Sequence, residues 1–251
     1  MPDIPPIAAS VSALLCDADG NLFPSEEPAF EASTEVTNRF LTELGSPQRF
    51  TAEELRRAAT GMSFRAVAAR LAAEHGREDV DVEPWVAEEQ RAVTAHLART
   101  LRPHPETTEA LQRFAETLTL AAVSSSALGR LAACFTATGL DDLIPPERRF
   151  SAEDSLPTPT SKPDAAIYLF ACERLGIPPG AGLAVEDSVP GVRSAVAAGC
   201  PTVGNLLFVP KGEREDRKAA LTDAGARAVV HSWAELADLV LPAGDLTGAR
   251  P

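Results

Sequence analysis

The sequence lacks a long run of basic residues, and it lacks an apolar stretch of about 18 residues of the kind that crosses a membrane. Its formal net charge is -13, from 23 Lys and Arg against 36 Asp and Glu. A protein surface that binds nucleic acid or an acidic membrane needs an excess of positive charge. We therefore expect neither nucleic acid nor a membrane as a partner.

Cysteine is scarce, and its spacing fits no CxxC motif and no Cys/His zinc site. The segment Met1–Ser10 has no basic region of the kind that begins a secretory signal. Buried free thiols are therefore expected in place of disulfides, and we expect the protein to be cytoplasmic. The four cysteines are Cys16, Cys134, Cys172 and Cys200.

Length and composition are those of a globular protein. The chain has 251 residues, of which 45% are hydrophobic and 24% charged. A chain of this length can bury a large core. We found no internal repeat and no low-complexity segment, so the sequence indicates one domain, or one domain with an inserted lobe.

The pattern of apolar residues changes along the chain. Residues 11–16 (VSALLC) are a short apolar run that stops at an acidic loop, which predicts a buried strand. Residues 26–99 then have the periodicity of helices separated by Gly and Pro. From residue 106 onward helices alternate with short apolar strands, which predicts a parallel sheet covered by helices on both faces. The helical stretch is then an insertion after the first strand.

Three of the predicted strands end in polar side chains. In parallel sheets, ligands bind beyond the carboxyl ends of the strands. These side chains should therefore meet at one edge of the sheet. In chain order they are Asp17 and Asp19, then Ser124, then Glu186 and Asp187.

The paired acids suggest phosphoryl transfer. One carboxylate, Asp17 or Asp19, can attack phosphorus to give an aspartyl-phosphate, and the other can protonate the leaving oxygen and then deprotonate water. Four acids at one edge repel one another unless a hard cation such as Mg²⁺ lies among them. Plainer interpretations also exist: Asp and Gly are common in ordinary turns, and Asp187 with Ser188 could cap the next helix.

Ser124 and Lys162 supply a hydroxyl donor and a positive charge, which a transferring phosphoryl group needs on its oxygens. Each also has a plainer interpretation. The serines from Ser124 to Ser126 could cap the helix that follows, and Lys162 could be a loop lysine in solvent.

The order of these elements resembles the haloacid dehalogenase superfamily, in the small-helical-cap branch of sugar phosphatases and beta-phosphoglucomutase. The matching segments are CDADGNL, AAVSSS, TSKPDAAIYLFA and LAVEDSVPGVRSAVAAG. The resemblance implies an α/β fold with a Rossmann-like parallel sheet, helices on both faces and an inserted all-helical cap. The catalytic core would comprise residues 1–22 and 103–251, and the cap residues 23–102.

The resemblance also implies an activity. It implies a magnesium-dependent phosphatase that hydrolyses a small phosphorylated metabolite, a sugar or sugar-acid phosphate, through an aspartyl-phosphate, as a monomer or weak homodimer. The expected catalytic residues are Asp17 and Asp19; the phosphate ligands are Ser124, Ser125 and Lys162; the magnesium ligands are Asp17, Asp19, Asp187 and Glu186; and the substrate contacts of the cap are Glu26, Gly61 and Arg65.

Two positions depart from the pattern of the family. Asn21 stands where Thr is usual, and Pro24 stands where many relatives have Asp. Asn21 can still form side-chain hydrogen bonds, so we expect a modest effect on activity. Pro24 fixes one backbone angle close to the expected hinge of the cap, which predicts a less mobile hinge.

Three alternatives remain open at the level of sequence. Mutases of this branch usually carry Lys in the cap loop, and Thr60 at that position favours hydrolysis over a phosphomutase. A non-catalytic binding protein on the same fold is a further possibility, because fold does not determine function. Arg65 could also be an ordinary helix-surface residue behind an N-cap at Ser63.

Overall fold

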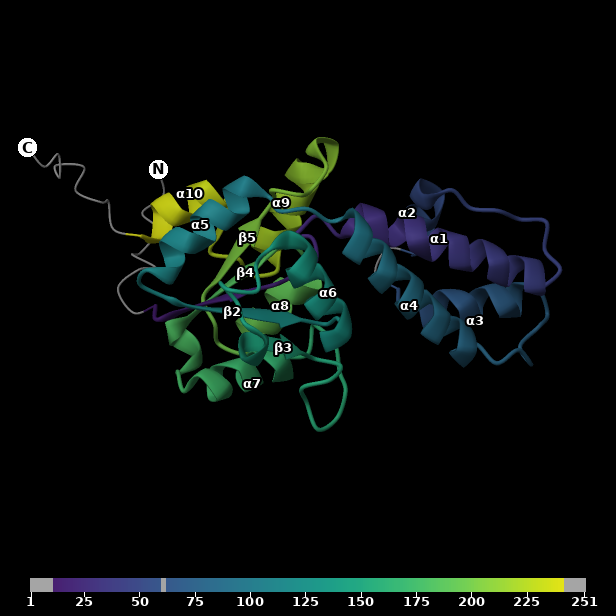
Figure 1. Ribbon diagram of the computed structural model, residues 1–251, viewed down its shortest axis with the longest axis horizontal. Helices are drawn as coiled ribbons and strands as arrows, with labels where there is room; N and C mark the ends of the chain where they lie inside the picture. The colour runs from purple at the N-terminus through teal and green to yellow at the C-terminus, as the bar shows by residue number, and fades with distance from the viewer. Residues whose placement is uncertain (1–10, 60–61, 242–251) are drawn as a thin grey trace, which may run out of the picture. The chain divides into compact units, whose positions relative to one another are not determined.

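The computed structural model describes residues 11–59 and 62–241 (Figure 1). Two compact units make up the chain. The larger unit comprises the chain up to Phe23 and from Arg102 onward, and the smaller unit comprises Pro24–Leu101. Within the described ranges, no helix is both long and apolar enough to cross a membrane.

A six-stranded sheet forms the centre of the larger unit, in the order β3-β2-β1-β4-β5-β6. Every pairing between neighbouring strands is parallel. Parallel strands end at the same edge, so the residues that follow β1, β2 and β4 lie near one another. The strands are β1 (Ala13–Cys16), β2 (Thr119–Ser124), β3 (Arg149–Ser151), β4 (Gly182–Glu186), β5 (Thr202–Asn205) and β6 (Ala228–Val230).

Helices cover both faces of this sheet, which confirms the expected α/β fold (Figure 1). The pair α5 and α10 packs on one face, and α7 and α8 pack on the other. The helices of this unit are α5 (Pro105–Ala115), α6 (Leu128–Thr138), α7 (Ala166–Leu175), α8 (Val189–Ala197), α9 (Arg214–Asp223) and α10 (Trp233–Val240).

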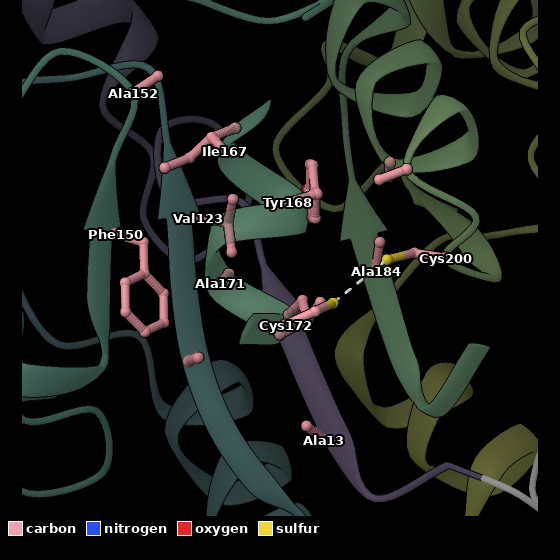
Figure 2. Close-up of a cluster of buried hydrophobic side chains, with 14 residues drawn as sticks. Ala13, Val123, Phe150, Ala152, Ile167, Tyr168, Ala171, Cys172, Ala184 and Cys200 are labelled. Carbon is pink, nitrogen blue, oxygen red and sulfur yellow. Dashed lines mark hydrogen bonds between the residues drawn. The ribbon is translucent and has the colours of Figure 1, made fainter. Parts of the chain in front are cut away.

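The core between the sheet and α7 contains several alanines of the strands, together with Val123 and Phe150 (Figure 2). Ala13, Ala184 and Ile167 are fully buried in it. Alanines on the strands let α7 lie close to the sheet. The thiols of Cys172 and Cys200 also meet here, with their sulfur atoms 3.8 Å apart. All four cysteines are free and buried, which confirms the expectation from the sequence.

Helices are the only regular elements in the described part of the smaller unit. They are α1 (Glu26–Glu43), α2 (Ala52–Ala59), α3 (Phe64–Glu74) and α4 (Glu83–Thr100). Their apolar faces form a core of their own, which includes Phe40, Leu55 and Leu71. The ring of Trp85 packs edge-on against Phe40, with the ring centroids 5.3 Å apart.

Candidate active site

Three acids converge beyond the carboxyl ends of β1 and β4. Asp17 follows the last residue of β1, Glu186 is the last residue of β4, and Asp187 comes next. All three are buried, and each offers a carboxylate oxygen within 4.8 Å of the others. Oxygen donors grouped in this way are the ligands that Mg²⁺ and Ca²⁺ prefer.

Lys162 links these acids to the end of β2. Its ammonium donates to Asp17 Oδ1 at 2.5 Å, to Glu186 Oε1 at 2.6 Å and to the main-chain oxygen of Val123 at 2.7 Å. The Lys162 side chain is only 5% exposed, so the interpretation of a loop lysine in solvent is wrong. Burial alone would lower the pKa of Lys162, but the Asp17 and Glu186 carboxylates outweigh it and raise this pKa above its usual value. The lysine therefore stays charged.

Three acids and one lysine lie together in this cluster, and the acids repel one another. Burial raises the pKa of Asp17 well above its usual value, and the neighbouring Glu186 and Asp187 add to the effect while Lys162 opposes it. A divalent cation among the acids would offset the excess negative charge. The donor set and its charge thus fit a magnesium ion.

Tyr168 also contacts this cluster, and sequence reasoning missed it. Its hydroxyl donates to Glu186 Oε1 at 2.5 Å, on the same oxygen that accepts from Lys162. Tyr168 is the only tyrosine of the chain and lies fully buried on α7. In the sequence it has the pattern of a core aromatic residue, so no local signal distinguishes it.

The Asp19 carboxylate is held by different partners from those of Asp17. Asp19 Oδ1 forms an ion pair with Arg130 at 2.9 Å, and Asp19 Oδ2 accepts from the Ser126 hydroxyl at 2.7 Å. The carboxylates that cluster are those of Asp17, Glu186 and Asp187. Any contribution of Asp19 to a metal site would therefore have to come from its main-chain carbonyl. Arg130 lies on α6 and was missed at the level of sequence.

Ser124 and Ser125 lie where β2 ends. The Ser124 hydroxyl oxygen accepts from the main-chain N–H of Ser126 at 3.0 Å, and that of Ser125 accepts from the main-chain N–H of Lys162 at 3.1 Å. This second hydrogen bond joins the loop after β2 to the loop that carries Lys162. The helix α6 begins after Ala127, and no serine side chain caps it, so the interpretation of these serines as its N-cap is wrong.

Two glycines make room for the carboxylates. A Cβ at Gly20 would lie 2.5 Å from Asp187 Oδ2, and Gly20 also has a positive φ of 76°, which other residues rarely adopt. A Cβ at Gly191 would lie 1.7 Å from Glu186 Oε2. The N-cap of α8 is Ser188, whose side chain accepts from the main-chain N–H of Gly191. Asp187 therefore does not serve as the cap of this helix.

The expected substrate contacts of the cap lie in the smaller unit. Glu26 begins α1, Arg65 lies on α3, and Gly61 is outside the described residues. Arg65 is 53% exposed and pairs with Glu83, and Ser63 is the N-cap of α3. Arg65 is therefore an exposed residue on the surface of α3, behind the N-cap Ser63. Its contact with a substrate stays a prediction.

A family model described as haloacid dehalogenase-like hydrolase matches residues 11–199. The chain belongs to the haloacid dehalogenase-like hydrolases. It is 32% identical over 174 residues to a phosphoglycolate phosphatase of Thiobacillus denitrificans. This match covers 67% of this chain and 72% of that protein. Together with the acidic site, this family membership makes the chain a phosphatase of the haloacid dehalogenase type.

Solved structures of this family have the same fold. A haloacid dehalogenase family hydrolase of Deinococcus radiodurans, solved with bound phosphate and sodium, has a TM-score of 0.68 and 30% identity, and the match covers 94% of this chain and 100% of that chain. A CbbY variant of Rhodobacter sphaeroides, in complex with xylulose-(1,5)bisphosphate, has a TM-score of 0.67 and 25% identity, with 92% and 100% covered.

Proposed function

We propose that this chain is a magnesium-dependent phosphatase that transfers the phosphoryl group of a small sugar or sugar-acid phosphate to Asp17 and then to water. The observation that carries the proposal is the position of Lys162. Its ammonium bridges Asp17 and Glu186 at 2.5 and 2.6 Å, next to Asp187. Carboxylates and the positively charged Lys162, groups that phosphoryl transfer needs, therefore lie together at one edge of the sheet.

Asp17 is the nucleophile in this proposal. Lys162 donates to Oδ1 of the Asp17 carboxylate and so fixes the direction of the nucleophile. A bond forms between one oxygen of the Asp17 carboxylate and phosphorus while the bond from phosphorus to the ester oxygen breaks. Asp19 enters the first step protonated and gives its proton to the leaving oxygen. In the second step Asp19 accepts a proton from the water that attacks phosphorus, and the bond between phosphorus and Asp17 breaks, which releases phosphate.

Ser126 and Arg130 hold the two oxygens of Asp19 and so fix the direction of its side chain. Ser124, Ser125 and Lys162 are the groups we assign to the phosphoryl oxygens. Positive charge and N–H or O–H donors aimed at those oxygens are the main source of catalysis in phosphoryl transfer.

A magnesium ion held by these acids would supply positive charge, which favours the attack of a carboxylate on a phosphoryl group. We assign its ligands to Asp17, Asp187 and the main-chain oxygen of Asp19. Glu186 would act through water, since its Oε1 already accepts from Lys162 and Tyr168.

The division of the chain into two compact units supports separate roles for them, catalysis for the larger and substrate selection for the smaller. We assign residues 1–22 and 103–251 to the catalytic core and residues 23–102 to a cap that excludes water during the first transfer. In this scheme Glu26, Gly61 and Arg65 would select the substrate. The phosphoglycolate phosphatase relative and the CbbY complex with xylulose-(1,5)bisphosphate support small phosphorylated acids and sugars as the first substrates to test.

The test is a phosphate-release screen over sugar phosphates, sugar-acid phosphates, polyol phosphates and phosphoglycolate, with magnesium and with EDTA. We expect release that requires magnesium and is lost in Asp17→Asn. Asp238→Asn is the control, because Asp238 is an exposed residue of α10 paired with Arg113, and it should keep full activity. Isomerised sugar phosphate without free phosphate would identify a mutase, and no turnover of any compound would contradict catalysis.

A further inference from the structure

Asn21 connects the two strand ends that carry the acids. Its side-chain N–H₂ group donates to the main-chain oxygen of Asp17 at 2.9 Å and to that of Val185 at 3.0 Å. Asp17 follows β1, and Val185 immediately precedes Glu186 at the end of β4. The main-chain N–H of Asp17 donates to the same Val185 oxygen at 2.9 Å, so the Asn21 amide adds a second link between the two strand ends.

Asn205, at the end of β5, determines which way the Asn21 amide points. Its N–H₂ group donates to Asn21 Oδ1 at 2.9 Å, while its own Oδ1 accepts from the main-chain N–H of Leu207 at 3.1 Å. A main-chain N–H only donates and a main-chain oxygen only accepts, so the two ends of this chain of bonds are fixed. Only one orientation of each amide satisfies every bond.

The two side chains are buried, at 0% exposure for Asn21 and 1% for Asn205. The main-chain oxygen of Asn21 also accepts from the indole N–H of Trp233 at 3.0 Å. Asparagine is rarely buried, because an unsatisfied amide in the interior costs free energy, but a fully satisfied network holds one arrangement rigidly. This network contacts the main chain of Asp17 and of Val185, the residue before Glu186.

We propose that Asn21 and Asn205 form a positioning pair, which sets the spacing between Asp17 and the acids Glu186 and Asp187. Neither residue touches the substrate. Asn21 reinforces the main-chain bond between Asp17 and Val185, and Asn205 acts only through Asn21 by orienting its amide. The pair thus controls how well the acids fit one divalent cation. Its effect on turnover rests on the proposed function, whereas its effect on metal binding does not.

The first experiment measures the binding of magnesium alone by isothermal titration calorimetry. We expect Asn21→Ala and Asn205→Ala to weaken the affinity by about 10-fold or more, the usual effect of removing a group that orients metal ligands. Because Asn205 acts through Asn21, the double variant should bind no more weakly than Asn21→Ala. Effects of the two substitutions that add, or an unchanged affinity in folded Asn205→Ala, would overturn the proposal.

A control separates positioning from a general loss of stability. Asn38, in the smaller unit, donates to the main-chain oxygen of Phe50 at 2.9 Å and accepts from its N–H at 2.8 Å. Asn38→Ala therefore removes a comparable pair of bonds within the smaller unit and should leave the magnesium affinity unchanged. An equal loss in this variant would also overturn the proposal.

A second variant keeps the test decisive if Asn205→Ala does not fold. Asn205→Asp has the same shape, and its ionised carboxylate only accepts, so the Asn21 amide loses its donor and should turn over to present its oxygen to Asp17 and Val185. We expect the same or a greater loss of magnesium affinity, and, where a substrate is turned over, a lower kcat with KM little changed. Wild-type protein that binds magnesium but hydrolyses nothing would refute the proposed function alone.

Discussion

A single methyl group at Gly191 should displace the Glu186 carboxylate. A Cβ at this position would lie 1.7 Å from Glu186 Oε2 and 2.2 Å from its carboxyl carbon. No side chain tolerates such an approach, so Glu186 must take another rotamer. In doing so it leaves the Lys162 ammonium, now at 2.6 Å, and the Tyr168 hydroxyl, now at 2.5 Å.

The size of the effect follows from these two bonds. A hydrogen bond to a charged group contributes about 1.5–3 kcal/mol to stability, so the loss of two costs about 3–6 kcal/mol. Alanine in place of glycine within a helix returns up to about 1 kcal/mol. Gly191→Ala should therefore lower the free energy of unfolding by about 2–5 kcal/mol.

The assay is equilibrium unfolding in urea, with Trp85→Phe as the parent so that Trp233 alone reports on the larger unit. Trp233 is fully buried in that unit. The control is Gly129→Ala on α6, where an added Cβ meets nothing within 4 Å. This control should be neutral or stabilised by up to about 1 kcal/mol.

Two results would refute this reasoning. One is a Gly191→Ala protein whose free energy of unfolding lies within about 0.5 kcal/mol of the parent, the range of ordinary surface substitutions. The other is a double variant, Gly191→Ala with Glu186→Ala, that is clearly less stable than Glu186→Ala alone. Without the carboxylate there is no clash, so we expect the double variant to be no less stable than Glu186→Ala.

Further outcomes follow from the same contacts. Lys162→Met leaves Asp17 and Glu186 buried without the Lys162 ammonium. It should lower the rate of phosphate release by about 10²–10³-fold and the free energy of unfolding by about 3–5 kcal/mol. A stable, active variant would contradict this. Arg65→Ala should leave thermal unfolding unchanged, since Arg65 is 53% exposed, and should raise KM if Arg65 contacts substrate. Burial raises the pKa of Cys134 to about 12, and all four thiols are buried, so Ellman's reagent should titrate thiols only after unfolding.

The fold and the clustering of acids were predictable from the sequence because their signals are local. An apolar run such as β1 that stops at an acid marks a buried strand and its carboxyl end. Alternation of such runs with helices requires a parallel sheet, and a parallel sheet places its strand ends at one edge. The meeting of Asp17 with Glu186 and Asp187 follows from that topology.

The remaining contacts depend on how the elements pack, which no local pattern shows. Tyr168 looks like a core aromatic residue, and its hydroxyl meets Glu186 only because α7 docks close to the sheet over small residues. Gly191 has the pattern of an ordinary helix residue, yet a carboxylate fills the space of its missing side chain. The pairing of Asn21 with Asn205 likewise needs the end of β5 to lie beside the loop after β1.

The energetics of the acids argue for their function independently of any relative. Asp17, Glu186 and Lys162 are all buried, with side-chain exposures of 10%, 0% and 5%. Removing such ions from water costs several kcal/mol for each one, and their mutual attraction returns this cost only where the geometry is good. Apolar side chains of similar volume would often be at least as stable. The stability of the fold therefore does not require buried charge at this edge of the sheet, which supports the proposal that these residues serve a chemical role.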